Sequence, residues 1–285
     1  MKMGQRIITY GHMIRFSHSV FALPFAFSGV ALASLEHPVT LGAVLWICLA
    51  MVGARSAAMG FNRIVDWRMD AANPRTKGRE LPTRKISVHA AALFVALSGA
   101  VFLYAASRLN ALTFMLAPVA LAYVLFYSYT KRFTWVTHLF LGFALGMAPM
   151  GGWIAIAGSF SMSALLLGLA VTTWVAGFDI IYSCQDYDFD MAHGVHSIPQ
   201  RFGMHRALQA SRVLHACTMA FLLSLFFLLQ LAPVYLVGLA AVGALLAYEQ
   251  SLVKPDDLSK VNRAFFDLNG FVSILYFLFT LKAVL

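Results

Sequence analysis

Charged side chains are scarce in this 285-residue chain. Asp, Glu, Lys and Arg make up 12% of it, about half the quarter that is usual for soluble domains, whereas 60% of the residues are apolar. The mean hydropathy is +0.76. A water-soluble enzyme needs a more polar surface, a disordered chain needs fewer apolar residues, and a collagen-like fibre needs far more than the 20 glycines present. All three classes are excluded.

Cysteine is scarce as well. Cys48, Cys184 and Cys217 are odd in number and widely separated, so they form neither a disulfide framework nor the closely spaced pairs of a zinc site. The N-terminal segment lacks a short apolar stretch followed by a small-residue cleavage site. We therefore expect the first hydrophobic segment to be retained as a helix.

Long hydrophobic runs dominate the chain instead. Apolar stretches of 18 or more residues recur along most of its length, which is typical of a helical protein with several membrane spans. Turn-forming residues such as Pro38, Asn110 and Pro233 separate them. We predict an all-α, polytopic membrane protein with nine helices, at residues 17–35, 41–61, 87–107, 111–128, 135–157, 163–183, 207–229, 232–249 and 264–283.

Lysine and arginine are distributed unevenly over these predicted helices. Outside the spans, nearly all of them fall in the N-terminal segment and in alternate loops, whereas the opposite side holds only Arg108 and Lys282. Because basic loops stay cytoplasmic, the distribution predicts a cytoplasmic N-terminus and an external C-terminus. It also accounts for the net charge of +9, and no basic stripe on a soluble element indicates a nucleic-acid partner.

Two acidic motifs stand at cytoplasmic helix ends. The first motif, Asn62–Asp70, places Asn62, Asp66 and Asp70 four residues apart, so they share one face of a helix. The second motif, Asp179–Asp190, repeats that spacing 120 residues later. Its members at this spacing are Tyr182, Asp186 and Asp190, with Asp179 about one turn deeper. The match indicates a weak internal duplication, with one set of carboxylates in each half.

Carboxylates at this spacing repel one another unless a cation neutralises them. Their hard oxygen atoms suit Mg²⁺, which commonly bridges one or two carboxylates to substrate phosphates. The basic residues that follow the first motif would then bind phosphate oxygens. The alternative is that both motifs are solvated helix ends with surface ion pairs. This alternative does not explain why two sets of carboxylates with the same spacing lie on one side of the membrane.

At these residues the chain resembles the UbiA family of intramembrane aromatic prenyltransferases. The family motifs N-x-x-x-D-x-x-x-D and D-x-x-Y-x-x-x-D-x-x-x-D both occur here without substitution. Residues 75–82, with the sequence RTKGRELP, are similar to the family's R-T-x-x-R-x-L-P loop, and residues 129–132 also fit. The resemblance covers nearly the whole chain. It implies a single domain over residues 1–285, with nine helices around a central cavity that a cytoplasmic cap covers.

The resemblance also implies the chemistry. Two Mg²⁺ ions would bind the diphosphate of a polyprenyl diphosphate, ionisation would leave an allylic cation, and an electron-rich aromatic ring would attack it. A dry cavity would protect the cation from water, and the bilayer would hold the prenyl tail. The implied magnesium ligands are Asp66, Asp70, Asp186 and Asp190. The implied diphosphate contacts are Asn62, Arg75, Arg79 and Lys131. The implied catalytic residues are Arg55, Asp179 and Tyr182.

Several of these assignments have structural alternatives. Arg55 lies about two turns from Asn62 on the same predicted face, and we interpret it as a contact for the carboxylate of an aromatic acid, with an ion pair to Asp179 as the alternative. By resemblance, Asp179 would orient or deprotonate the acceptor hydroxyl. Tyr182 would contact diphosphate or acceptor, or else anchor the helix at the membrane interface.

The basic residues and Asn62 have alternatives too. Arg75, Arg79 and Lys131 could serve only as topology determinants. Asn62 could make a helix–helix hydrogen bond. We interpret Asp188, which falls off the spacing, as solvated, and His138 as a buried histidine satisfied in the core.

The acceptor is predicted only by class. Residues 16–24 and 130–135 resemble a bacterial branch that acts on 4-hydroxybenzoate, or in some members on 1,4-dihydroxy-6-naphthoate. The branch implies a multi-pass protein of the bacterial inner membrane, with its active site on the cytoplasmic side, in ubiquinone or menaquinone biosynthesis. A membrane transporter with an intramembrane ion site is the alternative. It fits less well because the acids cluster at the cytoplasmic ends.

Overall fold

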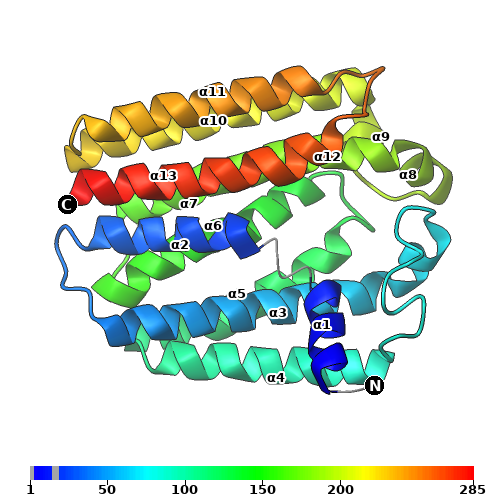
Figure 1. The fold of residues 1–285 in the computed structure, drawn as a ribbon, viewed down its shortest axis with the longest axis horizontal. Helices are drawn as coiled ribbons and strands as arrows, with labels where there is room; N and C mark the ends of the chain where they lie inside the picture. Colours follow the sequence, from blue (N-terminus) through cyan, green and yellow to red (C-terminus); the bar gives the residue numbers. More distant parts are fainter. Residues whose placement is uncertain (1–2, 15–18) are drawn as a thin grey trace. The chain divides into compact units, whose positions relative to one another are not determined.

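A computed structural model describes residues 3–14 and 19–285, all coloured in Figure 1. Apart from one isolated bridge between Lys254 and Asp257, the regular structure of these residues is helical, which confirms the all-α prediction. The contacts divide the chain into two compact units. The first unit comprises residues 1–19 and 41–129, and the second comprises residues 20–40 and 130–285. Residues 16–18 of the segment that resembles the 4-hydroxybenzoate branch lie outside the described residues.

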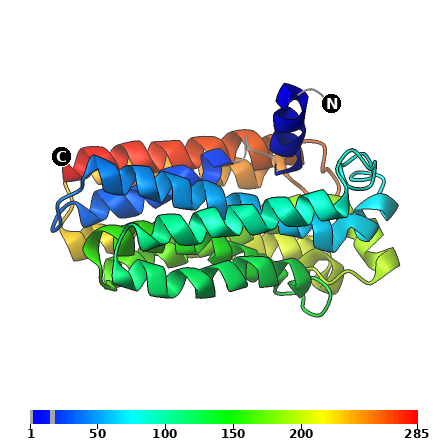
Figure 2. The same cartoon turned by 90° about the horizontal axis from the view of Figure 1, so that it is seen from below.

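The first unit is built on one long helix. Its elements are α1 (Met3–Met13), α3 (Leu41–Ala72), α4 (Val88–Ser107) and α5 (Ala111–Thr130). The helices α3 and α4 lie side by side in both views of the ribbon (Figures 1 and 2). Gly53 permits this approach, because a Cβ there would lie 2.8 Å from the Phe102 amide nitrogen. Small residues at such interfaces are typical of membrane helices.

The second unit surrounds helix α7, which is the most deeply buried of the apolar helices. Helices α6 and α10 pack along α7, and α11 pairs with α13. Gly142 lets α6 approach α7 closely, because a Cβ there would collide with the Thr172 carbonyl oxygen. Its elements are α2 (Ser19–Ala33), α6 (Thr137–Ala157), α7 (Met162–Ser183), η2 (Cys184–Asp186), α8 (Tyr187–His193), α9 (Ile198–Phe202), α10 (Met204–Leu229), α11 (Val234–Leu252), α12 (Val261–Arg263), η3 (Ala264–Leu268) and α13 (Asn269–Val284).

The number of membrane-length helices differs from the prediction. All nine predicted segments are helical, but among the described residues seven helices are long and apolar enough to cross a bilayer. The first and last predicted spans correspond to shorter apolar helices, Leu23–Ala33 and Asn269–Val284. The last is short because the π-helical segment η3 interrupts the regular α-helix before Asn269. The nine-span count is therefore not confirmed, while the seven helices indicate a multi-pass membrane protein.

Helix α3 extends well past the predicted end at residue 61. It continues as regular α-helix to Ala72 and so includes the whole first acidic motif. Continuous helix is what the spacing of that motif requires, because side chains four residues apart then share a face. The predicted end at residue 61 marks the end of the hydrophobic run, and the structure confirms that the motif beyond it is helical.

Candidate functional site

The first acidic motif occupies one face of α3, as its spacing predicts. The Asn62 side-chain amide donates a hydrogen bond from Nδ2 to Asp66 Oδ2 at 3.1 Å. Asp66 is only 1% exposed, although a carboxylate at a solvated helix end would face water. Burial of this charge argues against the interpretation of the first motif as a solvated helix end, because a buried carboxylate needs partners.

The loop after α3 folds back onto the last carboxylate of the motif. Arg79 Nη1 lies 2.6 Å from Asp70 Oδ1, and the Thr76 hydroxyl donates to the Asp70 carbonyl oxygen at 3.1 Å. The turn begins where the Arg75 amide donates to Asn73 Oδ1 at 2.9 Å. The second carboxylate oxygen of Asp70, Oδ2, is buried and has no hydrogen-bond partner among the described residues. Because a buried oxygen without a partner is unfavourable, this atom is a candidate to bind a cation or a donor from a ligand.

The other candidates of the first unit lie on either side of this cluster. Arg55 is half-buried within the apolar part of α3, about two turns from Asn62. A charged side chain at such a position is expensive and is a functional candidate by default. Arg75 is exposed, whereas Arg79 is partly buried through its contact with Asp70. The structure therefore brings Asn62, Asp66, Asp70 and Arg79 together, with Arg75 at the edge.

The second acidic motif is not a continuous α-helix. Helix α7 ends at Ser183, residues Cys184–Asp186 form a 3₁₀ turn, and α8 begins at Tyr187. The Tyr187 amide donates to the Cys184 carbonyl oxygen, which marks the tighter turn. The expectation that Tyr182, Asp186 and Asp190 repeat the spacing of the first motif along one helix face is therefore wrong for this backbone. The turn leaves Asp186 half-exposed and Asp190 buried.

Asp190 is held by a residue that follows it in the chain. The Ser197 hydroxyl donates to Asp190 Oδ2 at 2.9 Å. Gly194, at φ +65°, ends α8 and allows the chain to reverse so that Ser197 reaches back. Lys131 and Asp186 lie close enough for their charges to act on the Asp190 carboxylate. The second unit thus gathers Lys131, Asp186 and Asp190, while Asp188 is exposed, as predicted.

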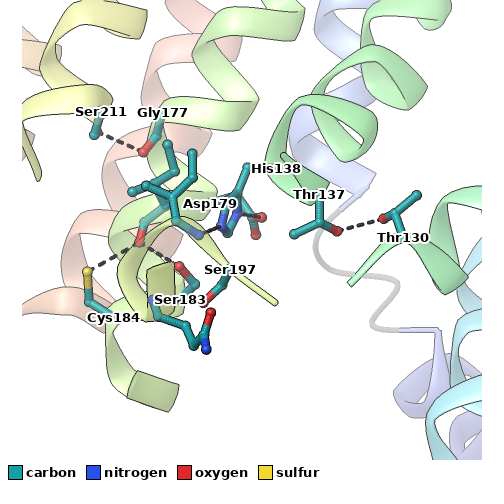
Figure 3. Close-up of polar contacts among 12 residues, drawn as sticks. Thr130, Thr137, His138, Gly177, Asp179, Ser183, Cys184, Ser197 and Ser211 are labelled. Carbon is teal, nitrogen blue, oxygen red and sulfur yellow. Dashed lines mark hydrogen bonds and ion pairs between the residues drawn. The ribbon is translucent and has the colours of Figure 1, made fainter. Parts of the chain in front are cut away.

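Asp179 is held by a histidine from the neighbouring helix α6. His138 Nδ1 and Asp179 Oδ2 are 2.7 Å apart, and Figure 3 shows the imidazole pointing toward the carboxylate. The His138 side chain is 3% exposed and that of Asp179 is 21% exposed. The prediction of a buried, satisfied histidine is confirmed, but the identity of its partner was missed. No spacing rule links two residues 41 positions apart.

Ser197 was missed by sequence reasoning altogether. A weak signal was available, because Ser197 precedes Pro199 in the pattern of a helix start, and its hydroxyl does accept a hydrogen bond from the Gln200 amide at the N-terminus of α9. That signal indicates a capping residue. It carries no information about the hydroxyl hydrogen, which is directed to Asp190.

The residues of both motifs fit a magnesium ion by their donor chemistry. Mg²⁺ usually binds one or two carboxylates and completes its coordination shell with water and phosphate oxygens. Asp70 Oδ2 is a buried oxygen of this kind. Within the described parts of the chain, no three acidic, histidine or cysteine residues form a group that could hold a metal by themselves. Any such ion therefore needs oxygen atoms from a substrate or water.

Comparisons with known proteins identify the family of the chain. The model of the UbiA prenyltransferase family matches residues 22–275. A 4-hydroxybenzoate octaprenyltransferase of Sodalis glossinidius (strain morsitans) is 32% identical over 255 residues, which cover 89% of this chain and 87% of that protein. The apo structure of a UbiA homolog from Aeropyrum pernix K1 is 35% identical, with a TM-score of 0.85, and covers 94% of this chain and 98% of that one.

A more distant structure shares the fold. It is that of a UbiA homolog from Archaeoglobus fulgidus bound to GPP and Mg²⁺, with 20% identity, a TM-score of 0.74, and coverage of 97% of this chain and 99% of that one. The family model spans both acidic motifs, and both units contribute residues to the match. The chain therefore belongs to the UbiA prenyltransferase family and is an enzyme of the prenyltransferase class.

Proposed function

We propose that this enzyme transfers a polyprenyl group from a polyprenyl diphosphate to the ring of a hydroxylated aromatic acid, either 4-hydroxybenzoate or 1,4-dihydroxy-6-naphthoate. The observation that carries the proposal is the buried carboxylate of Asp70, with one oxygen on Arg79 and the other without a protein partner. Such an arrangement suits a diphosphate-bound cation. The name of the Sodalis relative supports an aromatic acid as acceptor.

We assign the diphosphate and its metal ions to residues of the two acidic motifs. Asp66, Asp70, Asp186 and Asp190 would hold two Mg²⁺ ions, and Asn62 would support Asp66 through the observed hydrogen bond. When bound, the metal would supply positive charge that stabilises the departing diphosphate. Arg75, Arg79 and Lys131 would contact the diphosphate oxygens directly, since Arg and Lys pair well with phosphate.

We assign the aromatic acceptor to one residue from each unit. Arg55 would hold the carboxylate of the aromatic acid, and Asp179 would take the proton of its hydroxyl group. The bond between the prenyl C1 and the diphosphate oxygen breaks, with the electron pair leaving on oxygen. The activated ring carbon then bonds to C1, and the ring proton moves to the ring oxygen as the aromatic ring is restored. The proton taken by Asp179 passes to the released diphosphate, so the carboxylate is ready for the next cycle. Tyr182 would contact the diphosphate or the acceptor.

Membrane helices suit this chemistry because they keep water from the allylic cation. The distribution of Lys and Arg supports an active site on the cytoplasmic side of a bacterial inner membrane. The product would then enter ubiquinone or menaquinone biosynthesis.

Reconstituted protein tests the proposal directly. Proteoliposomes receive geranyl diphosphate, Mg²⁺ and either aromatic acid, and we expect diphosphate release together with a prenylated acid. Chelation of the metal should abolish both. Asp66→Asn and Asp186→Asn should remove activity, while Asp188→Asn, at an exposed position next to the same motif, should retain it. Substrate uptake without any prenylated product would contradict the proposal and favour a transporter.

A further inference from the structure

Three consecutive residues at the start of α9, His196 to Ile198, each donate a hydrogen bond to a different residue of the second unit. The His196 amide donates to the Lys131 carbonyl oxygen at 2.9 Å. The Ser197 hydroxyl donates to Asp190 Oδ2 at 2.9 Å, and the Ile198 amide donates to His138 Nε2 at 3.3 Å. All of these contacts lie within the second unit. The 196–198 segment therefore acts on functional groups from α6, α8 and the loop before α6.

The contact from Ile198 determines which nitrogen of His138 carries a proton. A backbone N–H can only donate, so Nε2 of His138 must accept and has no hydrogen. The hydrogen of the neutral ring then lies on Nδ1, the nitrogen that faces Asp179 Oδ2 at 2.7 Å. A doubly protonated imidazolium would place an N–H against the Ile198 N–H. The pair is thus a hydrogen bond from a neutral histidine to a carboxylate.

We propose that His138 is a positioning residue for Asp179, and that the 196–198 segment sets its tautomer through the Ile198 amide. The inference rests on the proposed function, in which Asp179 takes the proton of the acceptor hydroxyl. His138 holds one carboxylate oxygen of Asp179 in place by donating a hydrogen bond from Nδ1. The side chain of Asp179 remains 21% exposed, whereas that of His138 is enclosed.

Glutamine is the informative replacement for His138. Its side-chain amide offers one N–H donor for Asp179 and one oxygen that can accept from the Ile198 amide, as the neutral imidazole does. Leucine fills similar apolar space but offers neither. His138→Gln should therefore preserve the two hydrogen bonds that His138→Leu removes. A comparison of the two variants separates the effect of hydrogen bonding from that of packing.

The backbone donor can be removed separately. Ile198 is the first residue of α9, where proline is tolerated, and Ser197 before it is extended at φ −148° and ψ 164°, as a residue preceding proline prefers. Ile198→Pro removes the N–H without a clash with the backbone. Ile198→Val keeps the N–H and most of the buried apolar contact, so it is the matched control.

The kinetic test uses reconstituted protein with geranyl diphosphate, Mg²⁺ and saturating 4-hydroxybenzoate or the naphthoate. We expect His138→Leu and Ile198→Pro to lower kcat about tenfold or more, because a misplaced general base loses most of its effect. The KM for geranyl diphosphate should change by less than about twofold, and His138→Gln and Ile198→Val should stay near wild type. If Leu and Gln variants were equally active, or if only the diphosphate KM rose, the proposal would be overturned.

A spectroscopic measurement keeps the test independent of turnover and of any variant that fails to fold. Wild-type protein labelled with ¹⁵N-histidine should show one buried imidazole with hydrogen on Nδ1 alone at neutral pH, and its signals should be missing in His138→Gln. An imidazolium or an Nε2–H tautomer at His138 would overturn the inference. Wild-type protein that showed the expected tautomer but formed no prenylated product would instead refute the proposed function.

Discussion

The two acidic motifs have the same spacing in sequence but different backbones. In the first unit, Asn62, Asp66 and Asp70 lie on one uninterrupted helix, and Asp66 receives its hydrogen bond from the residue four positions earlier. In the second unit, the helix stops after Ser183, and the 3₁₀ turn Cys184–Asp186 separates Tyr182 from Asp190. Equal spacing therefore did not produce equal geometry.

The partners of the carboxylates differ in the same way. Asp70 is paired with a cation, Arg79, from the loop directly after its own helix. Asp179 and Asp190 are held by neutral donors, His138 and Ser197, one from another helix and one from the loop after α8. A cation neutralises a carboxylate, whereas a neutral donor orients it and leaves its charge in place. Asp70 is thus held by an ion pair, whereas Asp179 and Asp190 each receive a hydrogen bond that orients the carboxylate.

Removal of the Asp70 charge should have the largest effect on activity. Asp70→Asn keeps the size of the side chain but weakens both the contact with Arg79 and any bond to a cation. We expect activity to fall by more than about 100-fold, because loss of a ligand exceeds the 10–100-fold cost of losing a supporting partner. The rate of prenyl transfer, measured at the Mg²⁺ concentration that saturates the wild type, tests this expectation. Recovery of the rate at higher Mg²⁺ would show that Asp70 affects only the affinity for the metal.

Substitution of Arg79 should have the second largest effect on activity. Its variants separate the role of the positive charge from that of the planar guanidinium. Arg79→Gln should lower kcat/KM for geranyl diphosphate by about 10–100-fold, since it removes a charge aimed at the diphosphate and leaves Asp70 without its partner. Arg79→Lys should fall between Gln and wild type because lysine lacks the planar fork of arginine. Arg84→Gln, at an exposed position in the same loop, is the control. Equal losses for Arg79→Lys and Arg79→Gln would mean that geometry alone matters.

Ser197→Ala should have a smaller effect on activity, of roughly tenfold, because it removes a partner of Asp190 and not the carboxylate itself. The change should appear as a shift of the activity titration to higher Mg²⁺ concentration, because a poorly positioned Asp190 binds the metal less tightly. Ser183→Ala is the matched control, since the Ser183 hydroxyl donates only to the Ile180 carbonyl oxygen one turn earlier. An unchanged metal titration for Ser197→Ala would show that this hydrogen bond does not position Asp190.

Ser87→Ala should have the smallest effect on activity. It compares a helix cap of the first unit with the cap that Ser197 forms in the second. Ser87 caps the N-terminus of α4 by accepting from the Ala90 amide, and it makes this capping contact in the first unit as Ser197 does in the second. Loss of such a cap costs about 1 kcal/mol of stability. Thermal unfolding in detergent should show this loss, while activity stays within about twofold of wild type. A tenfold loss of activity would place α4 in the site.

The sequence by itself determined the class of the protein. Long apolar runs predicted the helices, and the two acidic motifs identified the family. These signals are local, since a helix is recorded in the spacing of neighbouring residues and a motif in a short stretch of chain. The first motif could be placed correctly for the same reason, because a continuous helix carries it.

Tertiary structure decided how each carboxylate is held. His138 lies 41 residues from Asp179 and 60 from Ile198, and no periodicity relates these positions. The turn at Cys184–Asp186 and the reversal at Gly194 bring Ser197 back to Asp190. Hydrogen bonds of this kind depend on the path of the chain in space, because a donor must reach its acceptor within about 3 Å and at a suitable angle.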